Sequence, residues 1–209
     1  MNALIVVAHP DDEALGCGAT AAALAHSGVG VRTCILSGRA SARRQRPSDP
    51  DLLADTLRAH EALGLEHPIM GDFPNIMFNT VPHLELVQFV EAAMAETRAQ
   101  VIFTHHPADL NDDHGHTSRA CQAAARLFQR RADFPPLRAL YFMEVLSSTD
   151  WSFAAGAGGF APDAFFEIGE DWLARKLKSL AAYRGGQAGV RYAEAFQTAF
   201  RSLAAGDFV

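Results

Sequence analysis

The stretch Ala3-Leu4-Ile5-Val6-Val7-Ala8, followed at once by His9-Pro10-Asp11-Asp12-Glu13, decides the fold of this chain. A short apolar run without charges is typical of a strand buried on both faces of a sheet. Pro10 fixes φ and has no amide hydrogen, so the strand ends there in a stiff turn. The histidine and acids that follow are thereby delivered to the carboxyl edge of a sheet, where open α/β folds bind their ligands.

This first motif has two interpretations. His9 and Asp12, three residues apart, suit a divalent ion such as zinc. Alternatively, the acids only favour the first turn of the next helix, and His9 is an ordinary, partly buried histidine. Short motifs produce false matches, so this stretch alone does not decide between the two.

A second cluster favours the metal site. The strand-like run Val101-Ile102-Phe103-Thr104 leads into His105-His106-Pro107-Ala108-Asp109-Leu110-Asn111-Asp112-Asp113-His114-Gly115-His116, with four histidines and three aspartates. A solvated acidic loop explains the aspartates but not so many imidazoles. Two such clusters, each at the end of a predicted strand, fit one shared site. Three protein ligands and one open position are typical of catalytic zinc.

Alternating strand and helix patterns predict one domain over residues 1–209. The expected fold is α/β, a single-domain three-layer Rossmann-like arrangement with a mostly parallel sheet and helices on both faces. The predicted strands cover 3–8, 29–36, 67–73, 101–104 and 137–145. The predicted helices cover 16–26, 51–63, 82–97 and 116–131, and 154–162 is expected to be a loop over the site.

Composition excludes several classes of function. The net charge of −6 argues against a nucleic-acid partner, which needs a basic face. No apolar run reaches the length of a membrane span, and no leader pattern opens the chain, so we expect a cytoplasmic protein without a membrane partner. One basic run is expected to be a solvated loop or a rim for an anionic substrate group; it contains Arg39, Arg43, Arg44 and Arg46. The cysteines lack metal-type spacing and are expected to be free, buried thiols in a reducing compartment; they are Cys17, Cys34 and Cys121.

In these motifs the chain resembles the PIG-L/LmbE-like zinc-dependent N-deacetylases. His9 to Glu13 is similar to the family's H-P-D-D-E motif, and Thr104 to His114 is similar to its T-H-x-P-x-D-x-(H/N)-x-D-H segment. Near the end, Tyr183 to Val190 and Tyr192 to Phe196 are similar to the family's terminal R-G-x-x-x-G-V-x-Y-A-E-A-F stretch. The likeness therefore runs through nearly the whole chain.

The resemblance implies roles for individual residues. His9, Asp12 and His114 match the metal ligands, and Asp11 matches the general base. Asp113 matches a carboxylate that orients its neighbours without binding the metal. Substrate contacts are implied at three further positions, which are Arg58, Asn75 and His106.

The chain departs from the family pattern in three places. Asn111 stands where many members have a histidine, and an amide can donate a hydrogen bond but cannot supply a proton. His106 or His116 is a candidate replacement for that histidine. Asn75-Ile76-Met77-Phe78-Asn79 stands where D-N-R-M-D is common, which predicts a less charged substrate rim. The family's P-H-P-R-S segment is not found between Lys178 and Tyr183.

The predicted function is that of a zinc-dependent amidohydrolase removing an N-acetyl group from an N-acetylated amino sugar or sugar conjugate. Asp11 and Asn111 are the predicted catalytic residues, Zn²⁺ is the expected cofactor, and Fe²⁺ is an alternative. The expected partner is the small N-acyl substrate, and a homo-oligomer is left open. Two alternatives remain: a metal-dependent hydrolase of another amide in natural-product or cofactor metabolism, and a non-catalytic metal- or ligand-binding relative.

Overall fold

The computed structural model describes residues 1–38, 52–146, 148–150 and 159–183, and the five strands among them form one parallel sheet. Their order is β3-β2-β1-β4-β5, as predicted for a mostly parallel α/β fold. The basic run at 39–46, the segment 154–158 and the terminal motif from residue 184 onward lie outside the described residues.

The strands are short and apolar. They are β1 (Asn2–Val7), β2 (Gly30–Ile35), β3 (Ile69–Met70), β4 (Val101–His105) and β5 (Ala139–Met143). The helices are α1 (Asp12–His26), α2 (Leu52–Leu63), α3 (His83–Thr97), α4 (Asp112–Ala124) and α5 (Glu170–Ala182). Two short 3₁₀ turns, Phe78–Thr80 and Leu127–Gln129, complete the regular structure of the described residues.

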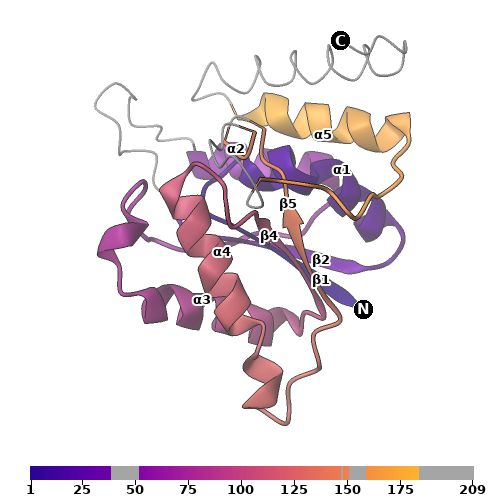
Figure 1. Cartoon of the computed structure of the whole chain (residues 1–209). Coiled ribbons are helices and arrows are strands. Elements are labelled where there is room, and N and C mark those ends of the chain that lie inside the picture. The colour runs from indigo at the N-terminus through magenta and orange to yellow at the C-terminus, as the bar shows by residue number, and fades with distance from the viewer. Residues whose placement is uncertain (39–51, 147, 151–158, 184–209) are drawn as a thin grey trace.

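The helices form a layer on each face of the sheet. α3 and α4 cover one face, and α1, α2 and α5 cover the other (Figure 1). Alternating β1 side chains enter the two cores: Leu4 and Val6 pack with the α3/α4 layer, whereas Ile5 and Val7 pack with the α1 layer. Burial on both faces explains why the first strand is a continuous apolar run.

The centre of the sheet is a topological switch point. The chain leaves β1 towards β2 on one side and later returns to β4 on the other, so β1 lies between them. Val6 pairs with Thr104 in the β1–β4 register, which places the two ends of these strands beside each other. Ligands bind at such a point in doubly wound sheets, and both His/Asp clusters follow these two strands.

The main differences from the sequence prediction are the helix starts and α5, where no helix was predicted. α1 begins at Asp12 rather than at residue 16, and α4 begins at Asp112 rather than at 116. In both cases the acids occupy the first helical turn, where the helix dipole favours them. The helix-capping interpretation of the first motif is therefore correct for Asp12 and Glu13, and it coexists with the site described below. α4 also ends at Ala124, earlier than predicted.

Two further expectations concern burial and membranes. All three cysteines are buried free thiols, as predicted. Within the described ranges, no helix combines the length and the apolar character that crossing a membrane requires.

Candidate active site and metal centre

His9 leaves the end of β1 with both ring nitrogens directed at carboxylates. Its Nε2 donates to Asp113 Oδ2 at 2.9 Å, and its Nδ1 lies 3.5 Å from Asp12 Oδ2. Because Nε2 holds the proton for Asp113, Nδ1 is the nitrogen with a lone pair for a metal. Burial opposes a charge on this ring, but the bonds to Asp113 and Asp12 outweigh burial and raise the pKa of His9.

Asp12 stands at the centre of the cluster. It is 4% exposed, and its Oδ2 accepts the His9 amide hydrogen at 2.9 Å. The same oxygen lies 3.2 Å from Nε2 of His114. Burial disfavours the carboxylate, yet the imidazole of His114 holds the pKa of Asp12 well below its usual range. Asp12 is therefore ionised, as a metal ligand must be.

His114 completes the group from the first turn of α4. Its Nδ1 faces Asp109 Oδ2 at 3.1 Å, so Nε2 is the nitrogen directed at Asp12. That Nε2 is buried without a hydrogen-bond partner among the described residues. Burial opposes a charge on His114, but Asp12 and Asp109 prevail and raise its pKa to about 10. The surroundings of His114 Nε2 thus favour positive charge at the point where a divalent ion would bind.

The ligand atoms of His9, Asp12 and His114 lie within 4.8 Å of one another. Two imidazoles and one carboxylate suit Zn²⁺ and also Fe²⁺. Each histidine is oriented through its second nitrogen by a buried carboxylate, which is the usual arrangement around metal-ligating histidines. The donor set therefore fits the expected metal.

A second group in the same place fits less well. His105, Asp109 and His114 also bring their ligand atoms within 4.8 Å. However, Nε2 of His105 accepts the amide hydrogen of Ala8 at 2.9 Å, which occupies its lone pair. Burial and neighbouring His114 lower the pKa of His105 to about 3, so its ring is neutral. The His105 ring stacks on the His114 ring with 3.8 Å between the ring centroids, and this contact helps to hold the His114 ring in place.

Asp109 is the orienting residue that the sequence analysis did not single out. Its Oδ2 accepts from Ser148 at 2.9 Å and from Thr149 at 2.8 Å, in addition to facing His114. Asp109 belongs to the second cluster, so its position was visible in the sequence. The two hydroxyl residues follow β5 in a segment without a recognisable motif, and no sequence signal pointed to them.

Asp113 makes the contacts that its predicted orienting role requires. Besides His9, it accepts the amide hydrogens of Ile76 at 2.6 Å and Phe78 at 3.0 Å. Ile76 has φ 59, a left-handed conformation that β-branched residues rarely adopt. The carboxylate of Asp113 thus fastens the loop before α3 directly beside a candidate ligand.

Asn111 is the N-cap of α4. Its side-chain Oδ1 accepts the backbone amide hydrogen of Asp113 at 3.0 Å, and its backbone amide donates to Asp109 Oδ1 at 2.8 Å. The residue therefore lies between the two carboxylates that orient the histidines. The predicted catalytic role of Asn111 is not visible in these contacts, which are those of a helix cap.

Asp11, the predicted base, precedes α1 in a left-handed conformation with φ 104 and ψ −27. It is half-buried, and its backbone amide donates to Glu13 Oε2 at 3.1 Å. The residue is thus adjacent in sequence to one candidate ligand and two positions from another.

The predicted substrate residues lie in three different places. Arg58 on α2 forms an ion pair with Asp55 of the same helix. Asn75 directly precedes Ile76, and its Oδ1 is buried without a hydrogen-bond partner among the described residues. His106 belongs to neither group of candidate ligands, and its ring packs edge-on against Phe142 and Phe160.

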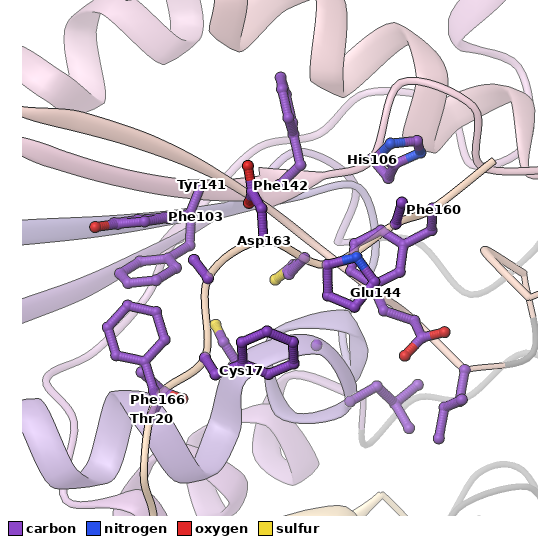
Figure 2. A pocket seen from close by; sticks show the side chains of 18 of the residues that line it. Cys17, Thr20, Phe103, His106, Tyr141, Phe142, Glu144, Phe160, Asp163 and Phe166 are labelled. Carbon is purple, nitrogen blue, oxygen red and sulfur yellow. The ribbon is translucent and has the colours of Figure 1, made fainter. Parts of the chain in front are cut away.

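His106 lines a cavity of about 700 Å³ beside β5. Figure 2 shows the rings of Phe103, Tyr141 and Phe166 on one side of it, with His106, Phe160 and Glu144 on the other. Cys17 of α1 also faces it, but burial raises the pKa of that thiol to about 12. A thiol that keeps its proton in this way is unsuited to act as a nucleophile.

Fold and site define the class of protein. Residues 4–125, which contain both clusters, match the family described as PIG-L, GlcNAc-PI de-N-acetylase, and the chain belongs to this family. The family description names a de-N-acetylase and the curated relative is described as a deacetylase, which supports a hydrolase activity for this chain. The predicted family is thereby confirmed.

Individual proteins of known sequence or structure are similar to this chain over most of its length. The chain is 24% identical to the uncharacterized deacetylase YaiS of Escherichia coli strain K12, over 87% of this chain and 89% of that protein. The crystal structure of the conserved protein TT1542 from Thermus thermophilus superposes with a TM-score of 0.75 and 26% identity, covering 96% of this chain and 86% of that one. The N,N'-diacetylchitobiose deacetylase of Pyrococcus horikoshii gives a TM-score of 0.71 at 15% identity, covering 97% and 77%.

Proposed function

We propose that this chain is a zinc-dependent N-deacetylase whose substrate is an N-acetylated amino sugar or a conjugate of one. The observation that carries the proposal is the convergence of His9 Nδ1, Asp12 Oδ2 and His114 Nε2, with both rings oriented by buried carboxylates. The substrate class is supported by the family description, which names an N-acetylglucosamine lipid, and by the diacetylchitobiose deacetylase of the same fold.

His9, Asp12 and His114 would hold the zinc. When bound, a zinc ion polarises a carbonyl and lowers the pKa of water towards neutrality. Asp113 and Asp109 keep the two imidazoles in the tautomers that present a lone pair to it.

Asp11 would take the proton from the attacking water and return it to the departing amine, as a general base and acid. Asn111 would donate a hydrogen bond to the developing oxyanion. Its Oδ1 is turned towards the Asp113 amide, so the NH₂ end of the same side chain is the end that would meet a substrate. Asn75, whose buried oxygen has no partner among the described residues, would accept from a sugar hydroxyl. Arg58 and His106 are proposed contacts farther from the metal.

A second candidate is a deacylase for a larger amide with an apolar portion, as in natural-product metabolism. It is favoured by Ile76 and Met77, which are 41% and 49% exposed on the loop fastened to Asp113. An N-acetylated sugar offers such a rim only its acetyl methyl group and C–H faces, whereas a larger amide with an apolar portion can cover it.

The proposal is tested by elemental analysis followed by an acetate-release assay. The substrate panel contains N-acetylglucosamine, glycosides of it with polar or apolar aglycones, and N-acetylated peptides. Acetate release from N-acetylglucosamine or any of its glycosides supports the first candidate, and release only from the N-acetylated peptides supports the second. Full metal occupancy with no turnover on any substrate would favour the non-catalytic alternative.

Two variants separate metal binding from catalysis. His114→Ala removes one of three ligands and should lower metal affinity by orders of magnitude, whereas His116→Ala, two residues along the same helix, should not. Asp11→Asn keeps the shape but cannot accept a proton, so it should retain metal and lose about 10²–10⁴-fold in turnover. Turnover of Asp11→Asn within a few-fold of the unsubstituted protein would move the base to another group.

A further inference from the structure

The backbone of Asp11 is held in an unfavourable conformation. Its φ of 104 lies beyond the usual left-handed region, where a side chain with a Cβ is disfavoured. Such conformations persist only when surrounding groups fix them, and they gather at functional sites. The conformation also sets the direction in which the Asp11 side chain leaves the chain.

Glu13 contributes to fixing it, beside the hydrogen bonds that the Asp11 carbonyl accepts from the amides of Ala14 and Leu15. Its Oε2 accepts the Asp11 amide hydrogen at 3.1 Å, and the residue is 0% exposed. A glutamate that merely favoured the helix dipole would remain in solvent. Burial of this carboxylate is costly unless its oxygens are occupied by donors, so the bond to Asp11 has a reason to persist.

Tyr183 occupies the other oxygen. Its hydroxyl donates to Glu13 Oε1 at 2.5 Å across 170 positions of sequence. Tyr183 is 6% exposed and follows the end of α5, which packs over α1 and α2 (Figure 1). The Glu13 carboxylate therefore has two donors in fixed places, one at the end of α5 and one in the turn before α1.

We propose that Glu13 is a positioning residue, which holds Asp11 in its left-handed conformation through the Asp11 amide and is itself held by the Tyr183 hydroxyl. The expected effect on turnover rests on the proposed function, in which Asp11 is the base. The expected effect on the backbone conformation of Asp11 does not rest on it. Misplacing a reacting group by about 1 Å can cost about 100-fold in rate, so a relaxed Asp11 should have a large effect on turnover.

The decisive variants differ in whether they still offer an acceptor to the Asp11 amide. Glu13→Gln keeps an oxygen for Asp11 and can donate its NH₂ to the Tyr183 oxygen. The double variant Glu13→Met with Tyr183→Phe removes both polar partners and keeps the volume, so it should still fold. Thr33→Val is the control, because it removes a buried 2.6 Å bond to His60 in the same layer without touching Asp11.

We expect the double variant to lose about 100-fold in kcat, with KM and metal content nearly unchanged. Glu13→Gln should stay within about 3-fold of the unsubstituted protein, because its oxygen still accepts from Asp11. Thr33→Val should lower only Tm. Unchanged kcat in the double variant, or a Glu13→Gln as inactive as the double variant, would overturn the proposal.

A crystal structure of the double variant gives a readout that needs no substrate. Asp11 should leave the left-handed region once its amide has lost the acceptor. A φ that stays near the original value would overturn the proposal even if activity fell. If no substrate of the panel is hydrolysed by the unsubstituted protein, the proposed function fails, and this structure still decides whether Glu13 positions Asp11.

Discussion

Replacing Asp113 by alanine should weaken metal binding although Asp113 is not a proposed ligand. The carboxylate accepts from His9 Nε2 and from the amides of Ile76 and Phe78, and it is 1% exposed. Loss of a carboxylate that orients a ligating histidine typically costs 10–100-fold in metal affinity, which is about 1.4–2.7 kcal/mol. The His9 ring would then be free to rotate or change tautomer.

The same substitution should destabilise the metal-free protein. Phe78 is fully buried and the His9 side chain is only 14% exposed, so little water replaces their lost charged partner, whereas Ile76 is an exposed residue whose amide can turn to solvent. At about 1.5–2.5 kcal/mol for each of the two unreplaced bonds, the free energy of unfolding should fall by about 3–5 kcal/mol.

Zinc affinity is measured by competition with a fluorescent chelator, and stability by urea unfolding of the metal-free protein. Asp112→Ala is the matched control, because Asp112 is the preceding residue in the first turn of α4 but its side chain is 67% exposed. Both substitutions remove the same charge from the same helix end. Zinc affinity unchanged in Asp113→Ala, or lowered equally in Asp112→Ala, would refute the reasoning.

Three further substitutions test other features. Asn111→Ala should cost about 1 kcal/mol of stability, because it removes the helix cap. Asn111→Ser restores the cap and the stability, but it should not restore turnover if the side-chain NH₂ of Asn111 donates to the oxyanion. Turnover equal to that of the unsubstituted protein in both variants would argue against that role. Burial raises the pKa of Cys121 to about 12, so on raising the pH the unfolded state loses this thiol proton before the folded state does. The free energy of unfolding should therefore fall from about pH 8.5 upward, by up to about 1.4 kcal/mol per pH unit for this thiol. In urea titrations Cys121→Ala should lessen that fall, whereas Met94→Ala, also buried, should leave the slope unchanged. Gly71→Ala should lower Tm strongly, because a Cβ there would lie 2.3 Å from the backbone oxygen of Leu36; an unchanged Tm would show that this approach is loose.

The apolar strands and both His/Asp clusters could be predicted from the sequence because their signals are local. The run 3–8 is continuous and uncharged, and the parallel order places its end beside that of 101–104. The helix starts were less predictable, because acids in a first turn and acids in a site have the same local pattern. Asp12 lies in the first turn of α1 and is also a candidate metal ligand.

The contacts that orient the site could not be predicted because they join distant segments. Asp109 is held by Ser148 and Thr149, about 40 positions away and without a motif. Glu13 meets Tyr183 only after α5 has packed on α1. Asn111 was predicted from its place in a motif, but the motif could not show that its oxygen caps α4.

The order of the strands has a consequence for how the candidate metal site forms during refolding. The Asp113 carboxylate meets His9 across 104 positions of sequence, and the two come together only when β4 has docked against β1. Contacts of such long range form late, since the loop-closure entropy must be overcome before they contribute. The β1–α1 unit alone holds only His9 and Asp12, too few ligands for a tight complex. Uptake of the proposed zinc ion in a stopped-flow experiment should therefore report the docking of β4 against β1, and not the formation of any single strand–helix unit.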